Sequence, residues 1–368
     1  MADASWTIDR KSPILALEDK ELTQSALVSF GLCKRKFHWT VNEKLEPDRQ
    51  EKPLALGDLI HKLLADMYTR AGVKNGTLLN PTVDLLGPQG VIEKWRKTRE
   101  NTKYSDDDYE LIALAISMMM AVESKFGDGS DMKIIGVEFP ISVPVRERPG
   151  WWFRGKLDLL IEDDQGNLVI IDHKSTTKQR KTHGLDGDLN YQGWDYCAIA
   201  SRFFQKHVSR FMLQGLRKKI PTEVKALKSG LPSAKVTPDT YLARFDLDFE
   251  KGKFKELAEY DEIDYRPIRQ ELRNREDRDG NEYVWRKSAH IPMSFIKRFW
   301  HDVAEKIDEL SEEKRWLPSW GACDMWKRRC AFSPLCVYGD SPTARMGFKT
   351  RTGHYLPSVK EEDDDTET

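Results

Sequence analysis

Long apolar runs are missing from this chain of 368 residues. The longest, residues 111–122, is about 12 residues long and contains Ser117, so it is too short to cross a bilayer. The first residues, MADASWTIDR, lack the charged and then apolar layout of a signal peptide. We therefore expect no membrane partner and a cytoplasmic location.

Cysteine is also scarce, with five residues in the whole chain. An odd number of thiols without an export signal argues against a disulfide framework and favours metal or redox use. Cys323, Cys330 and Cys336 lie close together in the sequence, and Cys33 lies far upstream. Four clustered thiolates suit zinc or an iron–sulfur cluster, and their spacing alone leaves both open. Cys197 has apolar neighbours and is predicted to be a buried structural thiol.

Two common catalytic motifs are absent as well. The stretch from Gly150 to Lys156 matches the G-x-x-x-x-G-K pattern of ATP-binding loops. However, Leu157 stands where Ser or Thr must bind Mg²⁺, and the pattern that follows predicts a strand instead of a helix. We therefore expect no ATP site. No H-E-x-x-H sequence of a zinc protease occurs either.

The charge of the chain is nearly balanced but unevenly placed. The formal net charge is -1, and six of the last eight residues are acidic, so the remainder carries a net positive charge. Between residues 210 and 235 the basic residues strongly outnumber the single acid, Glu223. A basic body permits a nucleic-acid partner, although a solvated surface with a frayed acidic end would have the same composition.

The layout of apolar residues predicts both helices and strands. Hydrophobic residues are 39% of the chain, enough for a core, and the length suggests about two domains. The helical period predicts helices over residues 56–68, 107–126, 189–205 and 295–316. Alternation predicts strands over residues 135–145, 152–162 and 168–174. Residues 211–240 are mixed, and the highly charged residues 270–285 are predicted to be loop-like.

The strongest indication of function lies in the predicted hairpin, residues 152–174. If Gln165 is the centre of the turn, Asp158 faces Asp172 at about 5 Å between Cα atoms. Lys174 follows two residues later and lies on the same face as Asp172. Two carboxylates beside an ammonium suit Mg²⁺ or Mn²⁺, which activate water and neutralise charge on a phosphodiester. The alternative, a surface hairpin with Asp–Lys pairs, is disfavoured by the apolar run before Asp172.

These elements resemble the PD-(D/E)xK nuclease superfamily. The stretch from Gly155 to Asp158 is similar to its G-x-x-D element, and the stretch from Asp172 to Lys174 to its D-x-K element. The resemblance implies an α/β fold with a mixed central sheet flanked by helices. It also implies that Asp158 and Asp172 bind Mg²⁺ or Mn²⁺ and that Lys174 acts with the attacking water.

Two further motifs resemble the RecB-type branch of that superfamily. In order along the chain, Gly57 and His61 are similar to its G-x-x-x-H motif, and Gln192 with Tyr196 to its Q-x-x-x-Y motif. The resemblance implies that His61 is a further metal ligand. It implies that Gln192 and Tyr196 contact DNA or buttress the site. Glu138, on the preceding strand, is a weaker candidate for the acidic residue often found there.

The cysteines resemble those of RecB-type nucleases that carry a [4Fe–4S] cluster, as in AddB-like and CRISPR-adaptation nucleases. One cysteine precedes the core and three follow it, a layout that Cys33, Cys323, Cys330 and Cys336 share. The chain departs from the usual pattern because Trp326 stands where a second, closely spaced cysteine is expected. The resemblance implies an iron–sulfur staple, with zinc or no metal as alternatives.

Four regions are predicted along the chain. They are an N-terminal helical region (1–130), a nuclease core (131–215), a basic and helical region with the cysteine cluster (216–340) and a disordered acidic tail (341–368). The expected function is that of a metal-dependent DNA exonuclease at ends or on single strands. It would act in recombination, repair or phage replication, with a recombination or replication protein as partner, in a bacterial or phage-infected cell. An endonuclease on the same fold, a non-catalytic DNA-binding scaffold and a structural metalloprotein are the alternatives.

Overall fold

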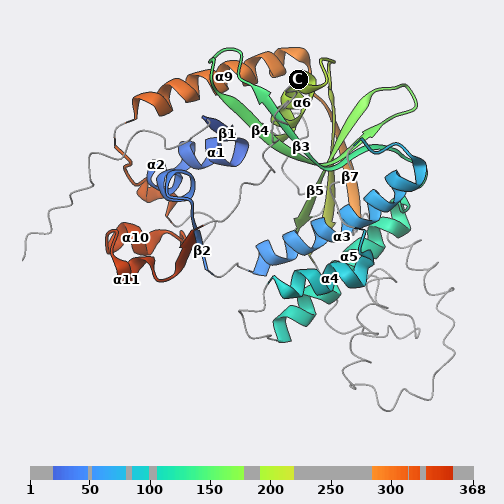
Figure 1. The fold of residues 1–368 in the computed structure, drawn as a ribbon, viewed down its shortest axis with the longest axis horizontal. Helices are drawn as coiled ribbons and strands as arrows, with labels where there is room; N and C mark the ends of the chain where they lie inside the picture. The colour runs from blue at the N-terminus through green and yellow to red at the C-terminus, as the bar shows by residue number, and fades with distance from the viewer. Residues whose placement is uncertain are drawn as a thin grey trace, which may run out of the picture. The chain divides into compact units, whose positions relative to one another are not determined.

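The chain folds into two compact units, each assembled from segments that lie far apart in the sequence (Figure 1). The computed structural model describes residues 20–48, 52–79, 85–98, 106–177, 191–218, 284–313, 315–323 and 329–350. Unit 1 comprises Met1–Gln50, Ser142–Arg154 and His301–Thr368, and unit 2 comprises Glu51–Ile141 and Gly155–Trp300. None of the described helices has the length and apolar character needed to cross a membrane.

Unit 2 is built on a mixed β-sheet. Its strands run in the spatial order β4 (Trp152–Glu162), β5 (Leu168–Thr176), β6 (Arg210–Arg217) and β7 (Val284–His290), and β3 (Lys133–Pro144) also pairs with β4. The β4–β5 and β6–β7 pairs are antiparallel, whereas β5 and β6 are parallel. A parallel pair needs a crossover connection, and α6 (Tyr191–Phe203) lies on the connection between β5 and β6.

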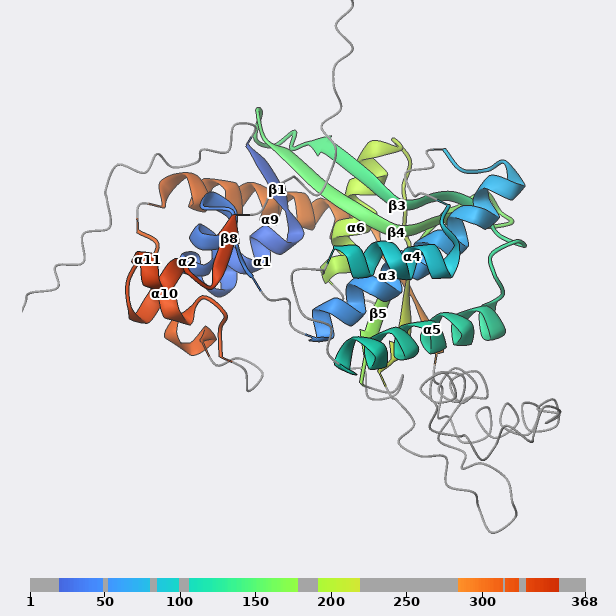
Figure 2. The ribbon, with the colours of Figure 1, turned by 60° about the horizontal axis from the view of Figure 1, so that its bottom comes forward.

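Helices cover both faces of this sheet. On one face lie α3 (Lys52–Asn75), α4 (Gly87–Lys97) and α5 (Asp106–Phe126), which pack together in both views of the ribbon (Figures 1 and 2). Met212 of β6 contacts the core that these helices form. The preceding residue, Phe211, lies against Gly193 of α6. Since successive strand residues point to opposite faces, α6 covers the other face. The predicted α/β fold with a mixed sheet flanked by helices is confirmed.

The core beneath α3, α4 and α5 explains why these segments are helical. Residues 55, 56, 59, 60, 63 and 64 of α3 are buried with the helical period, and residues 63–69 are all buried. The core, which includes Leu63 and Tyr68 of α3, also takes in residues from α4, α5 and the sheet, for example Trp95, Met118 and Ile171. Asp66 of α3 is buried too, and its Oδ1 accepts the main-chain N–H groups of Leu86 and Gly87 at the start of α4.

Two strands of unit 2 differ from the sequence predictions. Residues 211–240 are mixed in character, but 210–217 form β6. Residues 284 and 285, at the end of the range predicted as loop-like, begin β7, which carries charged residues such as Arg286 and Lys287. These strands do not show the alternation of apolar and polar residues that predicts a strand, because polar residues, among them Gln214, point into the interior. The last predicted helix is α9 (Met293–Glu312), which ends before Trp316.

Unit 1 joins segments from opposite ends of the described chain. Strand β1 (Glu21–Thr23) pairs in parallel with the first residues of β4, and β2 (Leu45–Pro47) pairs antiparallel with β8 (Phe348–Thr350). The other elements are α1 (Gln24–Leu32), α2 (Lys34–Phe37), the π-helix η1 (His38–Asn42), the 3₁₀-helix η5 (Trp320–Ala322), α10 (Ser333–Val337) and α11 (Pro342–Arg345). A small cluster of buried apolar residues joins η1 and β2 to α10 and α11: Trp39, Leu45, Phe332, Leu335 and Ala344.

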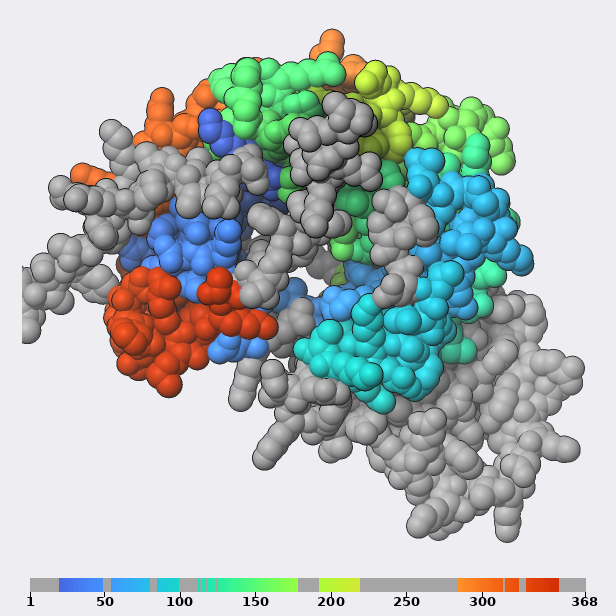
Figure 3. Space-filling model, in the orientation of Figure 1, coloured from blue at the N-terminus to red at the C-terminus, as the bar shows by residue number. Residues whose placement is uncertain are grey.

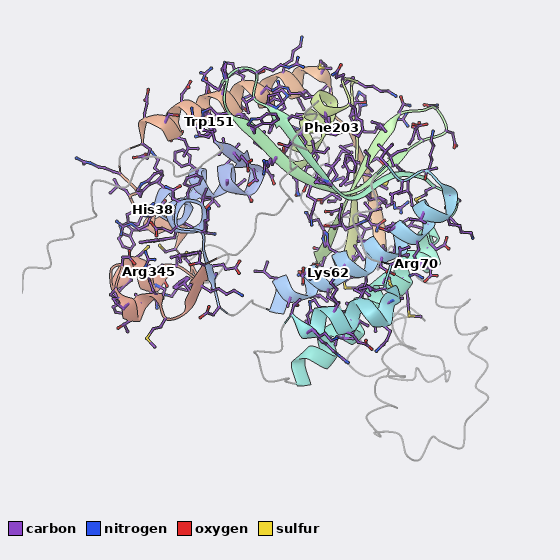
Figure 4. The ribbon with its side chains drawn as sticks, viewed as in Figure 1. His38, Lys62, Arg70, Trp151, Phe203 and Arg345 are labelled. Carbon is purple, nitrogen blue, oxygen red and sulfur yellow. The ribbon has the colours of Figure 1, made fainter. Side chains whose placement is uncertain are left out.

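Part of the predicted disordered tail is ordered. Residues 342–350 form α11 and β8, which appear with α10 as one compact red body in the space-filling view (Figure 3). Phe348 stacks on Phe332 with 5.1 Å between ring centroids. Arg345, labelled in Figure 4, pairs with Asp340 and with Glu43. The prediction of disorder is therefore wrong for residues 342–350, because their side chains have partners in the fold. Residues 351–368, with the acidic run, lie outside the described residues.

Candidate active site

The hairpin of β4 and β5 brings the two predicted carboxylates together. Leu159 pairs with Ile171, which is the register predicted from a turn centred at residue 165. The same register puts Asp158 opposite Asp172. The main-chain N–H of His173 donates a hydrogen bond of 2.8 Å to Asp158 Oδ2. Both carboxylates are buried, Asp172 completely, so their charges depend on protein groups instead of water.

Asp172 is the meeting point of three other predicted residues. The ammonium of Lys174 lies 3.0 Å from both of its carboxylate oxygens. Gln192 of α6 donates from Nε2 to Asp172 Oδ1 (3.1 Å) and to the hydroxyl of Tyr196 (2.8 Å). The i, i+4 spacing places Gln192 and Tyr196 on one face of α6. Gln192 and Tyr196 therefore lie beside the carboxylates and buttress Asp172.

His61 approaches the same carboxylates from α3. Its Nε2 lies 3.0 Å from the main-chain oxygen of His173. Because a carbonyl oxygen only accepts, Nε2 carries the hydrogen. The other ring nitrogen, Nδ1, lies 3.5 Å from Asp158 Oδ2 and 3.7 Å from Glu138 Oε1. Ligand atoms of His61, Glu138 and Asp158 all lie within 4.8 Å of one another.

Glu138 reaches this group because the backbone of β3 is irregular. Its φ of +46° lies in the left-handed region that non-glycine residues seldom adopt. The strand shows four buried residues in succession, Ile134 to Val137, before alternation resumes at Glu138. Such local strain persists where the surroundings hold it, often at functional sites. Glu138 also pairs with Lys156.

The charges of His61 and Asp158 stabilise each other. Burial lowers the pKa of His61, but Asp158 and Glu138 outweigh this effect and raise it to about 10. Burial alone would raise the pKa of Asp158, yet the charge and hydrogen bond of His61 hold it below its ordinary value. In the absence of another cation, a proton on His61 therefore balances the carboxylates.

Asp172 and Lys174 form a second charged pair with a different balance. Burial and the charge of Asp158 raise the pKa of Asp172 to about 6, although Lys174 and His61 oppose the shift. Burial lowers the pKa of Lys174, but the same carboxylates outweigh this, and its pKa lies above the ordinary value. With no other cation at the site, Lys174 is thus an ammonium at neutral pH and can donate hydrogen bonds.

The donor set fits a divalent cation. Within the part of the chain that the structure describes, Asp172 Oδ2 is buried and receives no hydrogen bond of good geometry, despite its closeness to Lys174. Asp158 and Glu138 add carboxylate oxygens, and His61 adds its Nδ1. The other ring nitrogen of His61, Nε2, is hydrogen-bonded to a main-chain carbonyl. A histidine oriented through its second nitrogen in this way is typical of metal sites. The residues therefore suit a hard cation with mainly oxygen ligands.

Comparison with protein-family models matches residues 21–337 to the PD-(D/E)XK nuclease superfamily. The chain belongs to that superfamily. It is therefore a nuclease by family, in the class of enzymes that hydrolyse phosphodiester bonds. No curated protein matches it. Among solved structures it is similar to the crystal structure of a candidate exonuclease from Eubacterium rectale. That likeness covers 93% of this chain and 94% of the other, at 11% identity and a TM-score of 0.47.

The site of this nuclease includes residues that the sequence analysis missed. Gln214 of β6 and Arg286 of β7 are linked by a hydrogen bond of 2.8 Å, and Gln214 lies 3.1 Å from Nδ1 of His173. No local pattern marks either residue, because their strands were not predicted and their partners lie far away in the sequence. A polar residue between two apolar ones in MLQGL is the one available signal at Gln214.

The four cysteines of the predicted cluster all lie in unit 1 of the nuclease. The N–H of Cys330 donates to the carbonyl of Cys323 at 2.6 Å, and the N–H of Ser319 donates to Cys33 Sγ at 3.4 Å. Burial raises the pKa of the Cys336 thiol, and the other three thiols add to the shift. None of the five cysteines, all of which the structure describes, forms a disulfide. The fold thus gathers the four thiols from both sides of the nuclease core.

The spacing of these sulfurs bears on what they can hold. No three of the four described sulfurs lie within 4.8 Å of one another. A tetrahedral zinc site with bonds of about 2.3 Å sets its sulfurs about 3.8 Å apart. A four-iron cluster holds its thiolates further apart, because the iron–sulfide core stands between them. Among the described residues the thiols are thus neighbours that are not packed as closely as the ligands of a bound zinc ion. Trp326, where the pattern departs from its relatives, lies outside the described residues.

Proposed function

We propose that this nuclease is a Mg²⁺- or Mn²⁺-dependent exonuclease that acts on DNA ends or single strands. The observation that carries the proposal is the convergence of His61, Glu138, Asp158 and Asp172 with the ammonium of Lys174 beside them. An ion held by these carboxylates and the imidazole would activate water and neutralise charge that develops on the phosphodiester. A purely structural cluster of carboxylates does not need a hydrogen-bond donor. Here the ammonium of Lys174 is such a donor, beside the carboxylates.

The roles of the protein groups follow from their contacts. Lys174 stays protonated, so it orients the attacking water and stabilises charge on a phosphoryl oxygen. The water oxygen forms the new bond to phosphorus and releases a proton to solvent, the bond to the leaving sugar oxygen breaks, and that oxygen takes up a proton from solvent. Gln192 keeps Asp172 aligned, and the hydroxyl of Tyr196 keeps Gln192 aligned. Each of these contacts is already formed, which lowers the reorganisation that the reaction requires.

DNA as substrate and an exonuclease mode rest on the resemblance to RecB-type nucleases and on the basic body of the chain. Most of the basic stretch, from residue 219 on, lies outside the described residues. A role in recombination, repair or phage replication, with a protein partner from that process, is part of the same proposal.

We further propose that Cys33, Cys323, Cys330 and Cys336 hold a [4Fe–4S] cluster. Their gathering in unit 1, where Cys33, Cys323 and Cys330 all act on the Cys336 thiol, supports this assignment. The cluster would join α2 and the segment after α9, which already meet where the N–H of Arg35 donates to the carbonyl of Leu317. Its contribution is structural, as a staple for a unit with a small apolar cluster.

The test uses end-labelled linear DNA and closed circular DNA, each single- and double-stranded, with protein purified without oxygen and supplied with Mg²⁺ or Mn²⁺. Cleavage of linear but not circular DNA, lost in Lys174→Ala, is the expected result. The matched control is Lys206→Ala, a residue that follows α6 and whose ammonium donates to the carbonyl of Gly166 in the turn of the hairpin. Cleavage of circles that is lost in Lys174→Ala would indicate an endonuclease. DNA binding without cleavage would indicate a scaffold.

A further inference from the structure

A line of buried polar groups runs behind the candidate metal site. Arg286 Nε donates to Gln214 Oε1 at 2.8 Å, and Gln214 Nε2 lies 3.1 Å from Nδ1 of His173. His173 then reaches the site through its main chain. Its N–H donates to Asp158 at 2.8 Å, and its carbonyl oxygen lies 3.0 Å from Nε2 of His61. Three neighbouring strands, β7, β6 and β5, thus contribute one residue each to a line that ends on two proposed metal ligands.

The direction of every hydrogen bond in this line is determined. A guanidinium only donates, so the Gln214 oxygen must be the atom that faces Arg286. The amide nitrogen of Gln214 then faces His173 and donates to Nδ1. Nδ1 is therefore an acceptor, and the ring hydrogen of His173 sits on Nε2. That Nε2 is buried and has no hydrogen-bond partner in the described part of the chain. Only the Gln214 link therefore fixes the ring by a hydrogen bond.

Packing holds the same side chains from the other side. The ring of His173 stacks on Tyr68 with 5.8 Å between centroids and 7° between planes. The guanidinium of Arg286 lies over the ring of Phe126, 3.9 Å from its centroid, and 3.5 Å from the hydroxyl of Tyr68. Gln214 is fully buried. The buried amide of Gln214 and the half-buried guanidinium of Arg286 cost free energy unless each is hydrogen-bonded, so the network favours this arrangement.

We propose that Gln214 and Arg286 are positioning residues of this nuclease. They hold His173 in one rotamer and one tautomer, and His173 in turn holds the backbone groups that orient Asp158 and His61. The inference rests on the proposed function, because it concerns the metal ligands named there. It assigns a role in the reaction to two residues that touch neither metal nor DNA. Outer partners of this kind typically change metal affinity or activity by about 10–100-fold when removed.

The first variant is Gln214→Met, which keeps the length of the side chain and removes both hydrogen bonds. We expect the affinity for Mn²⁺, measured by electron paramagnetic resonance of the free ion, to fall about tenfold or more. The matched control is Gln165→Met in the hairpin turn, where Gln165 Oε1 likewise accepts from an arginine, Arg210, at 3.1 Å. The control is expected to bind Mn²⁺ like the wild type.

The second variant, Gln214→Glu, separates positioning from general stability. A carboxylate still accepts from Arg286 but cannot donate, so His173 must move its ring hydrogen to Nδ1. Long-range ¹H–¹⁵N spectra of protein labelled in histidine distinguish the two tautomers, with His173→Phe to assign the signal. We expect the Nε2–H form in the wild type and the Nδ1–H form in Gln214→Glu, with Mn²⁺ affinity close to wild type because the link is restored.

Should Gln214→Met fail to fold, Arg286→Met and its conservative counterpart Arg286→Lys provide the same contrast, with the expected loss in the first and recovery in the second. Equal Mn²⁺ affinity in wild type, Gln214→Met and Arg286→Met would overturn the positioning role while leaving the nuclease proposal intact. An Nδ1–H form in the wild type would overturn it too. A wild type that neither binds Mn²⁺ nor cleaves DNA would overturn both proposals.

Discussion

The two units of the chain both gather side chains suited to metals, but they do so in different ways. In unit 2 the carboxylates and the imidazole are already oriented by hydrogen bonds from His173, Gln192 and Lys174, over a large apolar core. In unit 1 the four thiols are neighbours, yet no three of the described sulfurs come within 4.8 Å of one another. The first site is formed by the protein, whereas the second needs the group that it would hold.

The chemistry of the ligands accounts for this difference. Carboxylates, imidazole and ammonium are strong hydrogen-bonding groups, so protein donors and acceptors can hold them in place without an ion. Thiols are weak donors and acceptors, and only bonds to a metal orient them firmly. A catalytic ion that exchanges during the reaction suits the first kind of site, and a permanent structural group suits the second.

The largest expected effect concerns the preformed site. Asp172→Asn should lower cleavage by about 10³-fold. It should also leave the protein at least as stable at pH 8. Burial and the charge of Asp158 raise the pKa of Asp172 to about 6, so its ionised form is the one that folding disfavours. Folding therefore loses stability as pH rises from the unfolded value through 6, and Asn removes this loss.

Rates of cleavage and urea unfolding at pH 5 and pH 8 test this prediction. Asp163→Asn, in the turn of the same hairpin, is the matched control and should cleave like the wild type. Cleavage by Asp172→Asn at a rate within tenfold of the wild type would show that the reaction does not depend on this carboxylate.

The next effect concerns the thiols. Cys330→Ser should lower the melting temperature by about 10 °C and remove visible absorbance, because the proposed cluster joins the N-terminal segment that carries Cys33 to the C-terminal segments that carry the other three thiols. Cys197→Ala, a buried cysteine of unit 2 outside the proposed set, should keep the colour. Thermal unfolding and iron content provide the measurement. If the wild-type protein is colourless and Cys330→Ser has an unchanged melting temperature, the thiols of unit 1 do not hold a structural cluster, and this difference between the two units is wrong.

A smaller effect concerns the irregular strand. Glu138→Ala and Glu138→Gly both remove the carboxylate, so each should weaken Mn²⁺ binding by about tenfold. Glycine tolerates the φ of +46° and alanine does not, so the glycine variant should be more stable by about 1 kcal/mol. Mn²⁺ titration and urea unfolding measure the two quantities separately. A glycine variant less stable than the alanine variant would argue against strain at this position.

The smallest effect concerns a carboxyl of unit 2 that lacks this preorganisation. Asp195 of α6 is buried, neither of its oxygens has a hydrogen-bond partner among the described residues, and burial raises its pKa well above the ordinary value. A raised pKa in the folded state means that stability is highest at low pH and falls as pH rises. Asp195→Asn should therefore be more stable than the wild type at pH 8, by roughly 1 kcal/mol, or about 2–4 °C in melting temperature. The gain should shrink at pH 5, and a pH-independent difference would contradict this account.

Local sequence patterns were enough to predict part of this structure. Alternation around a turn centred at residue 165 predicted the register of β4 and β5, and the register alone set Asp158 opposite Asp172. Helical periodicity predicted α3, and with it the placement of His61. In each case the elements pair with near neighbours or bury a continuous apolar face, so the relevant physics is short-range.

Other features depended on contacts between distant segments. Strands β6 and β7 were not predicted, because Gln214 and Arg286 are polar and become satisfied only when the two strands lie together. The order of residues 342–350 was missed because β8 pairs with β2, some 300 residues earlier. The case for Glu138 as a member of the site depended on an irregularity in the backbone of β3, which residue types do not predict.

The sequence by itself determined which chemistry this protein contains. It showed two carboxylates and a lysine at the end of an apolar hairpin, a histidine on a helix, and thiols on both sides of the core. Only the tertiary structure decided how these groups are held. In the structure Nε2–H of His61 donates to a main-chain carbonyl, and Oδ2 of Asp172 has no hydrogen bond among the described residues. Arg286 is linked to His173 through Gln214. The reason is that hydrogen-bond direction and burial belong to pairs of residues in space, whereas residue type and period belong to the chain alone.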